Sequence, residues 1–131
     1  MNVAVVCIAL LDLLVFGLGI NVSWLRGKMK TGIGYPADRT HALQKACRAH
    51  ANGCEYAPTM AILMLVLALR DPAAWAVGLF FAATAARILH AVGMFASPTL
   101  AAAHPLRLVG AAGTYVTGLA VLGSVLSTWT S

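Results

Sequence analysis

The sequence predicts an all-α integral membrane protein, a four-helix bundle that forms a single transmembrane domain over residues 1–131. The first observation is composition, because 60% of the residues are hydrophobic and only 10% are charged, with a mean hydropathy of +0.83. A soluble domain of this length has too little interior to hide so much apolar surface. The second observation is that four apolar segments, each near the roughly 20 residues that cross a bilayer as a helix, are separated by short polar loops.

The first two membrane helices are predicted over residues 2–24 and 40–69. The first ends at Trp24, a residue type enriched at membrane interfaces. No basic stretch precedes it, so we expect a retained helix rather than a cleaved signal peptide. In the glycine- and lysine-rich loop that follows, Pro36 and Asp38 are suited to opening the second helix.

The third and fourth helices are predicted over residues 72–95 and 105–129, after a tight turn at residues 70–72 and a loop that reads ASPTLAAAHP. Basic side chains are concentrated between the first two helices, namely Arg26, Lys28, Lys30, Arg39, Lys45 and Arg48. The positive-inside rule therefore places this loop in the cytoplasm and both termini outside, across the inner membrane if the host is a bacterium. The net charge of +5 follows from this topology and does not indicate a nucleic-acid partner.

A polar cluster, RAHANGCEYAP at residues 48–58, begins the second helix's passage through the membrane. The apolar run from Tyr56 to Leu69 is only 14 residues long. The helix must therefore continue backwards through the cluster to cross a core that needs about 20 residues. Arg48, Asn52 and Glu55 follow i, i+4, i+7 spacing and share one helical face. Such groups must face protein or a wet cavity rather than lipid.

The third helix carries a matching set, because Arg87, His90 and Met94 follow i, i+3, i+7 spacing. Glu55 lies 15 residues before Arg70, and Arg87 lies 15 residues after the end of the tight turn, so antiparallel helices hold them at similar depth. We therefore predict a Glu55–Arg87 ion pair, which lowers the cost of burying either charge.

Positive charge exceeds negative charge on the cytoplasmic side of the predicted bundle. The cations there are Arg26, Lys28, Arg48, Arg87 and Arg107, against the single carboxylate of Glu55. This excess indicates an anionic ligand. The simpler alternative is that Glu55 and Arg87 only tie two helices together, while Arg48 and His50 extend to the lipid headgroups.

The cysteines and Asp12 point to other chemistry less strongly. Cys7 is in the first apolar segment, and Cys47 and Cys54 are seven residues apart in the second helix, a pattern that does not favour a disulfide. Cys47, His50 and Cys54 could meet zinc, but three ligands on successive turns of one helix rarely converge, so we expect no metal site. Asp12 either marks a proton pathway or makes a structural contact with a neighbouring helix or subunit, and we favour the structural contact.

RAHANGCEYAP resembles the signature of the MAPEG family, the membrane-associated proteins in eicosanoid and glutathione metabolism. That signature reads R-A-[HQ]-x-N-x-x-E and is followed shortly by proline. The matching residues here are Arg48, Ala49, His50, Asn52, Glu55 and Pro58. RILHAVG in the third helix resembles the family's second motif, and HPLR at the start of the fourth resembles the segment whose arginine acts on the glutathione sulfur. The resemblance covers nearly the whole chain.

The resemblance implies a homotrimer of four-helix subunits that binds glutathione between neighbours, near the cytoplasmic face. It implies ligand contacts from one subunit's second helix, at Arg48, Asn52, Glu55 and Tyr56. It implies further contacts from the third and fourth helices across the interface, at Arg87, His90 and Arg107. Arg107 is the implied catalytic residue that stabilises the glutathione thiolate. Arg26 is the implied partner of a glutathione carboxylate, and Lys28 is a weaker candidate.

Two positions depart from the family pattern. Met94 stands where several family enzymes have a tyrosine, and Ala51 stands where some have another arginine. The resemblance therefore favours a broad-range, microsomal glutathione transferase-like enzyme of detoxification over a specialised eicosanoid synthase. Such an enzyme conjugates apolar electrophiles drawn from membrane lipid, and peroxide reduction stays open as a second activity. Two alternatives from other classes are a non-catalytic lipid-binding member of the family and a small proton-coupled transporter that uses Asp12 and Glu55.

Overall fold

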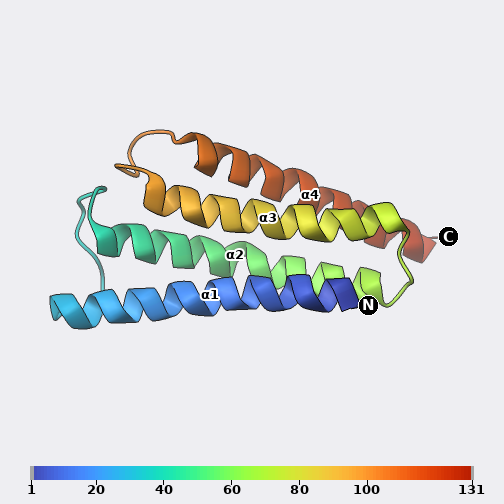
Figure 1. The fold of residues 1–131 in the computed structure, drawn as a ribbon, viewed down its shortest axis with the longest axis horizontal. Helices are drawn as coiled ribbons and strands as arrows, with labels where there is room; N and C mark the ends of the chain where they lie inside the picture. Colours follow the sequence, from blue (N-terminus) through green and yellow to red (C-terminus); the bar gives the residue numbers. More distant parts are fainter. Residues whose placement is uncertain (1, 131) are drawn as a thin grey trace.

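The computed structural model describes residues 2–130 and consists of four helices that run up and down in turn (Figure 1). They are α1 (Asn2–Met29), α2 (Ala42–Ala68), α3 (Ala74–Ala96) and α4 (Pro105–Thr130), and no strand occurs within these residues. Each helix is long and apolar enough to cross a bilayer. The predicted all-α membrane fold is confirmed. The α1–α2 and α3–α4 loops lie together at one end, which we call the loop end, and both termini lie at the other, the terminal end (Figure 1).

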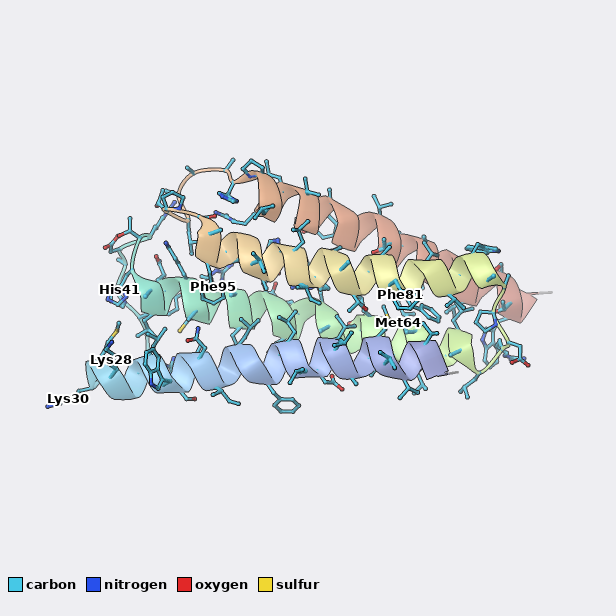
Figure 2. The ribbon with its side chains drawn as sticks, in the orientation of Figure 1. Lys28, Lys30, His41, Met64, Phe81 and Phe95 are labelled. Carbon is cyan, nitrogen blue, oxygen red and sulfur yellow. The ribbon has the colours of Figure 1, made fainter. Side chains whose placement is uncertain are left out.

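The helices pack as two extensive pairs. α1 lies along α2 and α3 lies along α4, while α3 also contacts both α1 and α2, and α1 does not touch α4. The largest buried cluster fills the half of the bundle nearer the terminal end, with Leu11, Met64, Phe80 and Val121 among its members. Figure 2 shows Met64 in that half of the bundle. Because this half is filled by apolar side chains, the polar residues of α2, α3 and α4 gather towards the loop end.

Two glycines bring α3 and α4 into backbone contact near the loop end. A methyl group added at Gly110 would lie 2.5 Å from the backbone nitrogen of His90, and one added at Gly93 would lie 2.6 Å from that of Arg107. Small residues of this kind let membrane helices approach closely where van der Waals packing drives their association. The crossing therefore holds His90 and Arg107 beside each other.

The α1–α2 loop is ordered by local hydrogen bonds rather than by the predicted cap. Neither Pro36 nor Asp38 opens α2, because His41 is its N-cap and accepts a 3.1 Å hydrogen bond from the Leu43 N–H through Nδ1. Asp38 Oδ1 instead accepts bonds from the Thr40 N–H at 2.9 Å and the Thr40 hydroxyl at 2.7 Å. These two bonds, the backbone one first, hold the pKa of Asp38 below its usual value.

Tryptophans are exposed at both ends of the bundle. α1 continues past Trp24, the predicted end of the first span, and the Lys28 ammonium lies 5.2 Å from the Trp24 ring. At the terminal end Trp75 and Trp129 are exposed, and the Arg70 guanidinium lies 3.9 Å over the Trp129 ring. Exposed tryptophans beside basic groups are typical of the two membrane–water interfaces. The arrangement agrees with a chain that spans the membrane between these two levels.

Candidate functional site

A cavity of about 490 Å³, which we call the polar pocket, opens at the loop end of the bundle. Three helices and both loops contribute to it. The lining residues are Tyr35, Arg39, Gln44, Arg48, Asn52, His90, Met94, Leu100 and Arg107. The sequence-predicted residues Arg48, Asn52, His90 and Arg107 are thus brought together within one chain.

The two loops are tied to each other over the polar pocket. The Leu100 N–H in the α3–α4 loop donates a 2.9 Å hydrogen bond to the carbonyl of Arg39 in the α1–α2 loop. Nearby, the Lys45 ammonium of α2 donates to the Ser97 carbonyl at the end of α3, at 2.7 Å. These bonds hold Arg39 at the mouth of the pocket, so a residue that the sequence assigned only to membrane topology becomes part of the site.

The charges of the polar pocket are unbalanced. Arg39, Arg48 and Arg107 line it, and among residues 2–130 no carboxylate does. The side-chain oxygen of Gln44 is buried and accepts no hydrogen bond from residues 2–130. A buried acceptor without a donor is costly unless a ligand supplies one. The pocket therefore suits a molecule that carries negative charge and also a hydrogen-bond donor.

Asn52 connects the pocket to the buried cation Arg87. Its side-chain oxygen accepts a 2.8 Å hydrogen bond from Arg87 Nη2, and its carbonyl accepts one of 3.1 Å from the same nitrogen. The Asn52 amide nitrogen in turn donates to Glu55 Oε2 at 3.4 Å. Arg87 also donates to the Thr114 hydroxyl, and it is only 2% exposed. Asn52 is therefore held in one orientation between a guanidinium and a carboxylate.

The predicted direct ion pair between Glu55 and Arg87 is wrong. No ion pair to Arg87 forms within residues 2–130, and the two charges are linked through Asn52 instead. The residue count to the turn placed Glu55 and Arg87 at similar depth, but depth alone does not decide which face of α2 meets α3. Asn52 precedes Glu55 by three residues, which turns the two side chains about 60° apart on a helix of 3.6 residues per turn. Asn52 faces α3, and Glu55 is exposed.

His90 and Arg107 are oriented by the α4 backbone at the glycine crossing. The Arg107 carbonyl can only accept, so His90 Nδ1 carries the hydrogen of their 3.1 Å bond and leaves Nε2 unprotonated in the neutral ring. Arg107 Nη1 donates to the Ala102 carbonyl at 3.1 Å. Arg107 is in the first turn of α4, whose free N–H groups favour an anion. Guanidinium and helix terminus thus act on the same part of the pocket.

The polar pocket leads into an apolar groove between α2 and α4. A small cavity of about 20 Å³, lined among others by Asn52, Tyr56, Arg87 and Tyr115, adjoins the pocket at Asn52 and His90. It shares Tyr56 and Tyr115 with a groove of about 320 Å³, which we call the apolar groove. The groove is lined by Tyr56, Thr59, Met60, Leu63, Thr114, Tyr115, Gly118, Leu119 and Leu122. A charged compartment and an apolar compartment thus meet at the two tyrosines.

Arg26, also expected in the site, lies elsewhere in the chain. Its guanidinium donates to the Gly32 carbonyl at 3.5 Å and approaches Cys47 Sγ at 4.0 Å, and it lines a separate, shallow hollow. The resemblance placed Arg87, His90 and Arg107 across a subunit boundary from α2. In this structure His90 and Arg107 line the same pocket as Asn52, and Arg87 bonds Asn52 directly.

Several lining residues were missed from the sequence. Tyr35, Arg39 and Leu100 belong to loops, whose folding over the helix ends follows no periodic signal. Tyr115 could have been found, because it follows Arg107 by eight residues and therefore lies on the same face of α4. The His50 and Cys54 side chains lie 3.7 Å apart, but no cluster of three metal-ligating side chains occurs within residues 2–130. All three cysteines are free thiols.

Comparison with known proteins agrees with the arrangement of helices and motif residues. The sequence profile of the MAPEG family matches residues 4–127, nearly the whole chain. No curated protein and no solved structure matches the chain significantly. The match includes α2, α3 and the start of α4, which supply Arg48, Asn52, His90 and Arg107 to the polar pocket. From its helices, its pocket and this match, we conclude that the chain is a member of the MAPEG family.

Proposed function

We propose that the protein is a membrane-bound glutathione transferase that conjugates apolar electrophiles. The observation that carries the proposal is the junction of two compartments, a pocket lined by three arginines without a carboxylate and an apolar groove beside it. Glutathione has two carboxylates, one ammonium and a thiol, which match an excess of cations accompanied by an acceptor. The groove faces the depth of the bilayer, where apolar electrophiles dissolve.

The pocket offers a partner for each polar group of glutathione. Arg39 and Arg48 are placed to bind carboxylates, since guanidinium groups bind them in bidentate fashion. The unpartnered oxygen of Gln44 accepts from the ammonium. Glu55 adds negative charge behind Asn52 and keeps the amide turned so that its oxygen meets Arg87. Met94 and Leu100 contribute apolar contact to the peptide.

Arg107 supplies the catalytic step. Conjugation needs a thiolate, and a free cysteine thiol, with a pKa of about 8.5, is mostly protonated at neutral pH. A guanidinium beside the sulfur lowers the thiol pKa by stabilising the anion, and the first turn of α4 adds its dipole. Arg107 lines the polar pocket and is held by the Ala102 carbonyl. The thiolate then attacks an electrophile that lies in the apolar groove.

A homotrimer completes the proposed site. Glu55 and Thr59 are exposed on the single chain although they lie inside the membrane span, and polar groups there need protein rather than lipid around them. A neighbouring subunit covers this face, and its Arg26, or less strongly its Lys28, reaches a glutathione carboxylate. Chemical crosslinking in mild detergent should give a ladder that ends at three subunits. A stable monomer that still binds glutathione would contradict the shared site.

The orientation in the membrane follows from charge. The loop end carries Arg26, Lys28, Lys30, Arg39, Lys45 and Arg48. Figure 2 shows Lys28 and Lys30 where α1 ends. The positive-inside rule places this end in the cytoplasm, where glutathione is abundant, and both termini outside. In a bacterium the membrane is the inner one.

The test is glutathione-dependent conjugation of 1-chloro-2,4-dinitrobenzene by the purified protein in detergent, together with thermal stabilisation by glutathione. We expect both, and we expect Arg48→Gln to reduce the stabilisation. Ser127→Ala, at the terminal end of α4, serves as the control that keeps both. If glutathione neither stabilises the protein nor reacts, the proposal is wrong.

A non-catalytic lipid-binding role is the second candidate, and the apolar groove is the observation that favours it. It predicts stabilisation by long-chain fatty acids without any conjugation. The transporter alternative has less support, because Asp12 is on an exposed face of α1 and does not line the polar pocket.

A further inference from the structure

Tyr56 and Tyr115 stand where the small cavity opens into the apolar groove. Tyr56 is on α2 and Tyr115 is on α4, and their hydroxyl oxygens lie 3.2 Å apart, within hydrogen-bond distance. Their rings meet edge to face, with centroids 5.8 Å apart and planes inclined at 63°. Both residues line the small cavity and the groove. The pair therefore places hydroxyl groups at the boundary between the thiol pocket and the lipid-like compartment.

One hydroxyl hydrogen of this pair is available to a ligand. Two hydroxyls carry two hydrogens, and the bond between them uses one. The Arg87 guanidinium lies 5.2 Å from the Tyr56 ring, and Arg87 is only 2% exposed, so water screens its charge little. A cation over the Tyr56 ring favours Tyr56 as the donor of the pair. Tyr115, which is 54% exposed, then keeps its hydrogen for a molecule in the groove.

We propose that the Tyr115 hydroxyl, supported by Tyr56, binds the carbonyl oxygen of α,β-unsaturated aldehydes and ketones with apolar tails, and stabilises the oxyanion that forms when glutathione adds to them. The inference rests on the proposed glutathione transferase activity and names its substrate class. Such a molecule has one polar acceptor and one alkyl chain. The acceptor meets the tyrosine pair, and the chain lies along Met60, Leu63 and Leu119.

The chemistry is a conjugate addition. The glutathione thiolate forms a bond to the β-carbon of the substrate, and the π electrons of the carbon–carbon double bond move towards the carbonyl to give an enolate. Tyr115 donates its hydrogen bond to the enolate oxygen, where negative charge develops. A proton from water then adds to the α-carbon, and the product is a saturated thioether aldehyde or ketone. The thiol hydrogen lost at the start balances the proton gained at the end, so no further reactant is needed.

The experiment compares two electrophiles on the full-length protein at saturating glutathione. The first is trans-2-nonenal, which forms an enolate oxygen, and the second is 1-chloro-2,4-dinitrobenzene, whose negative charge spreads over the ring and nitro groups. Removal of one oxyanion donor commonly costs enzymes about 100- to 1000-fold in rate. We expect Tyr115→Phe to lower kcat for trans-2-nonenal by at least about tenfold, and kcat for chlorodinitrobenzene by less than about twofold. Phenylalanine keeps the ring contact with Tyr56.

Further variants separate the possible outcomes. Tyr56→Phe keeps the donor but removes its support, so its loss with trans-2-nonenal should be smaller than that of Tyr115→Phe. Thr128→Val removes a hydroxyl that bonds the Val125 carbonyl of its own helix, and it should change neither rate. Equal losses on both electrophiles, or a wild type that conjugates chlorodinitrobenzene but not trans-2-nonenal, would overturn the tyrosine assignment while the transferase proposal stands. Loss of all conjugation and of glutathione stabilisation in the wild type would instead refute the transferase proposal itself.

Discussion

The contact between Gly110 and His90 can be tested by adding a single methyl group. In Gly110→Ala the new Cβ would lie 2.5 Å from the His90 nitrogen, 2.6 Å from its Cα and 2.8 Å from its Cβ. All three neighbours belong to the α3 backbone or its first side-chain atom, so no flexible side chain can move aside. To restore an ordinary contact near 3.4 Å, α3 and α4 must separate by about 0.9 Å at this level.

The expected cost follows from overpacking. Extra methyl groups in a well-packed interior cost about 1–3 kcal/mol. For a domain of this size we expect the melting temperature in detergent to fall by about 3–10 °C. The same separation moves Arg107 away from His90, so conjugation should fall more than stability alone requires. Differential scanning calorimetry and the chlorodinitrobenzene rate measure the two effects.

Gly123→Ala is the matched control on the same helix. A Cβ at Gly123 meets nothing within 4 Å among the described atoms of the chain, so the substitution is sterically free. Alanine is a better helix former than glycine by about 0.5–1 kcal/mol, and the change should therefore be neutral or stabilising. If Gly110→Ala is as stable and active as Gly123→Ala, the two helices do not meet closely at His90 and the reasoning fails.

Three further predictions concern the site and the loop. Asn52→Ala should destabilise the protein by about 1.5–3 kcal/mol and shrink its thermal stabilisation by glutathione, because the buried Arg87 loses a charge-assisted hydrogen bond. Unchanged unfolding and ligand stabilisation would rule out this role. Arg107→Ala should raise the pKa of bound glutathione, titrated through thiolate absorbance, towards the value of about 8.5 of a free thiol. An unchanged thiol pKa and turnover would make Arg107 an anchor only. The pKa of Asp38 is depressed by its bonds from Thr40, so these bonds are present above the usual value of 3.8 and are lost as pH falls below it. Amide exchange at Thr40, corrected for its intrinsic pH dependence, should therefore lose protection below that pH, whereas Asp38→Asn should show no such transition.

The sequence alone determined the membrane fold and the face of α2 that carries the site. Hydropathy and the 3.6-residue period are local properties, so four spans and the common face of Arg48 and Asn52 can be read without knowing how helices pack. The excess of cations over carboxylates at one end could be counted in the same way. The family signature also lies within one helix, which explains why it was visible in the sequence.

Only the tertiary structure decided which groups meet. Arg87 bonds Asn52 rather than Glu55 because the rotation of α2 against α3 selects the partner, and that rotation depends on packing along the whole helix pair. Arg39 enters the site because two loops bond each other across the helix ends, a contact between residues far apart in sequence. Tyr115 reaches Tyr56 because the glycine contacts set how closely α4 lies to the rest of the bundle. Such pairings are long-range consequences of packing, so no local pattern in the sequence encodes them.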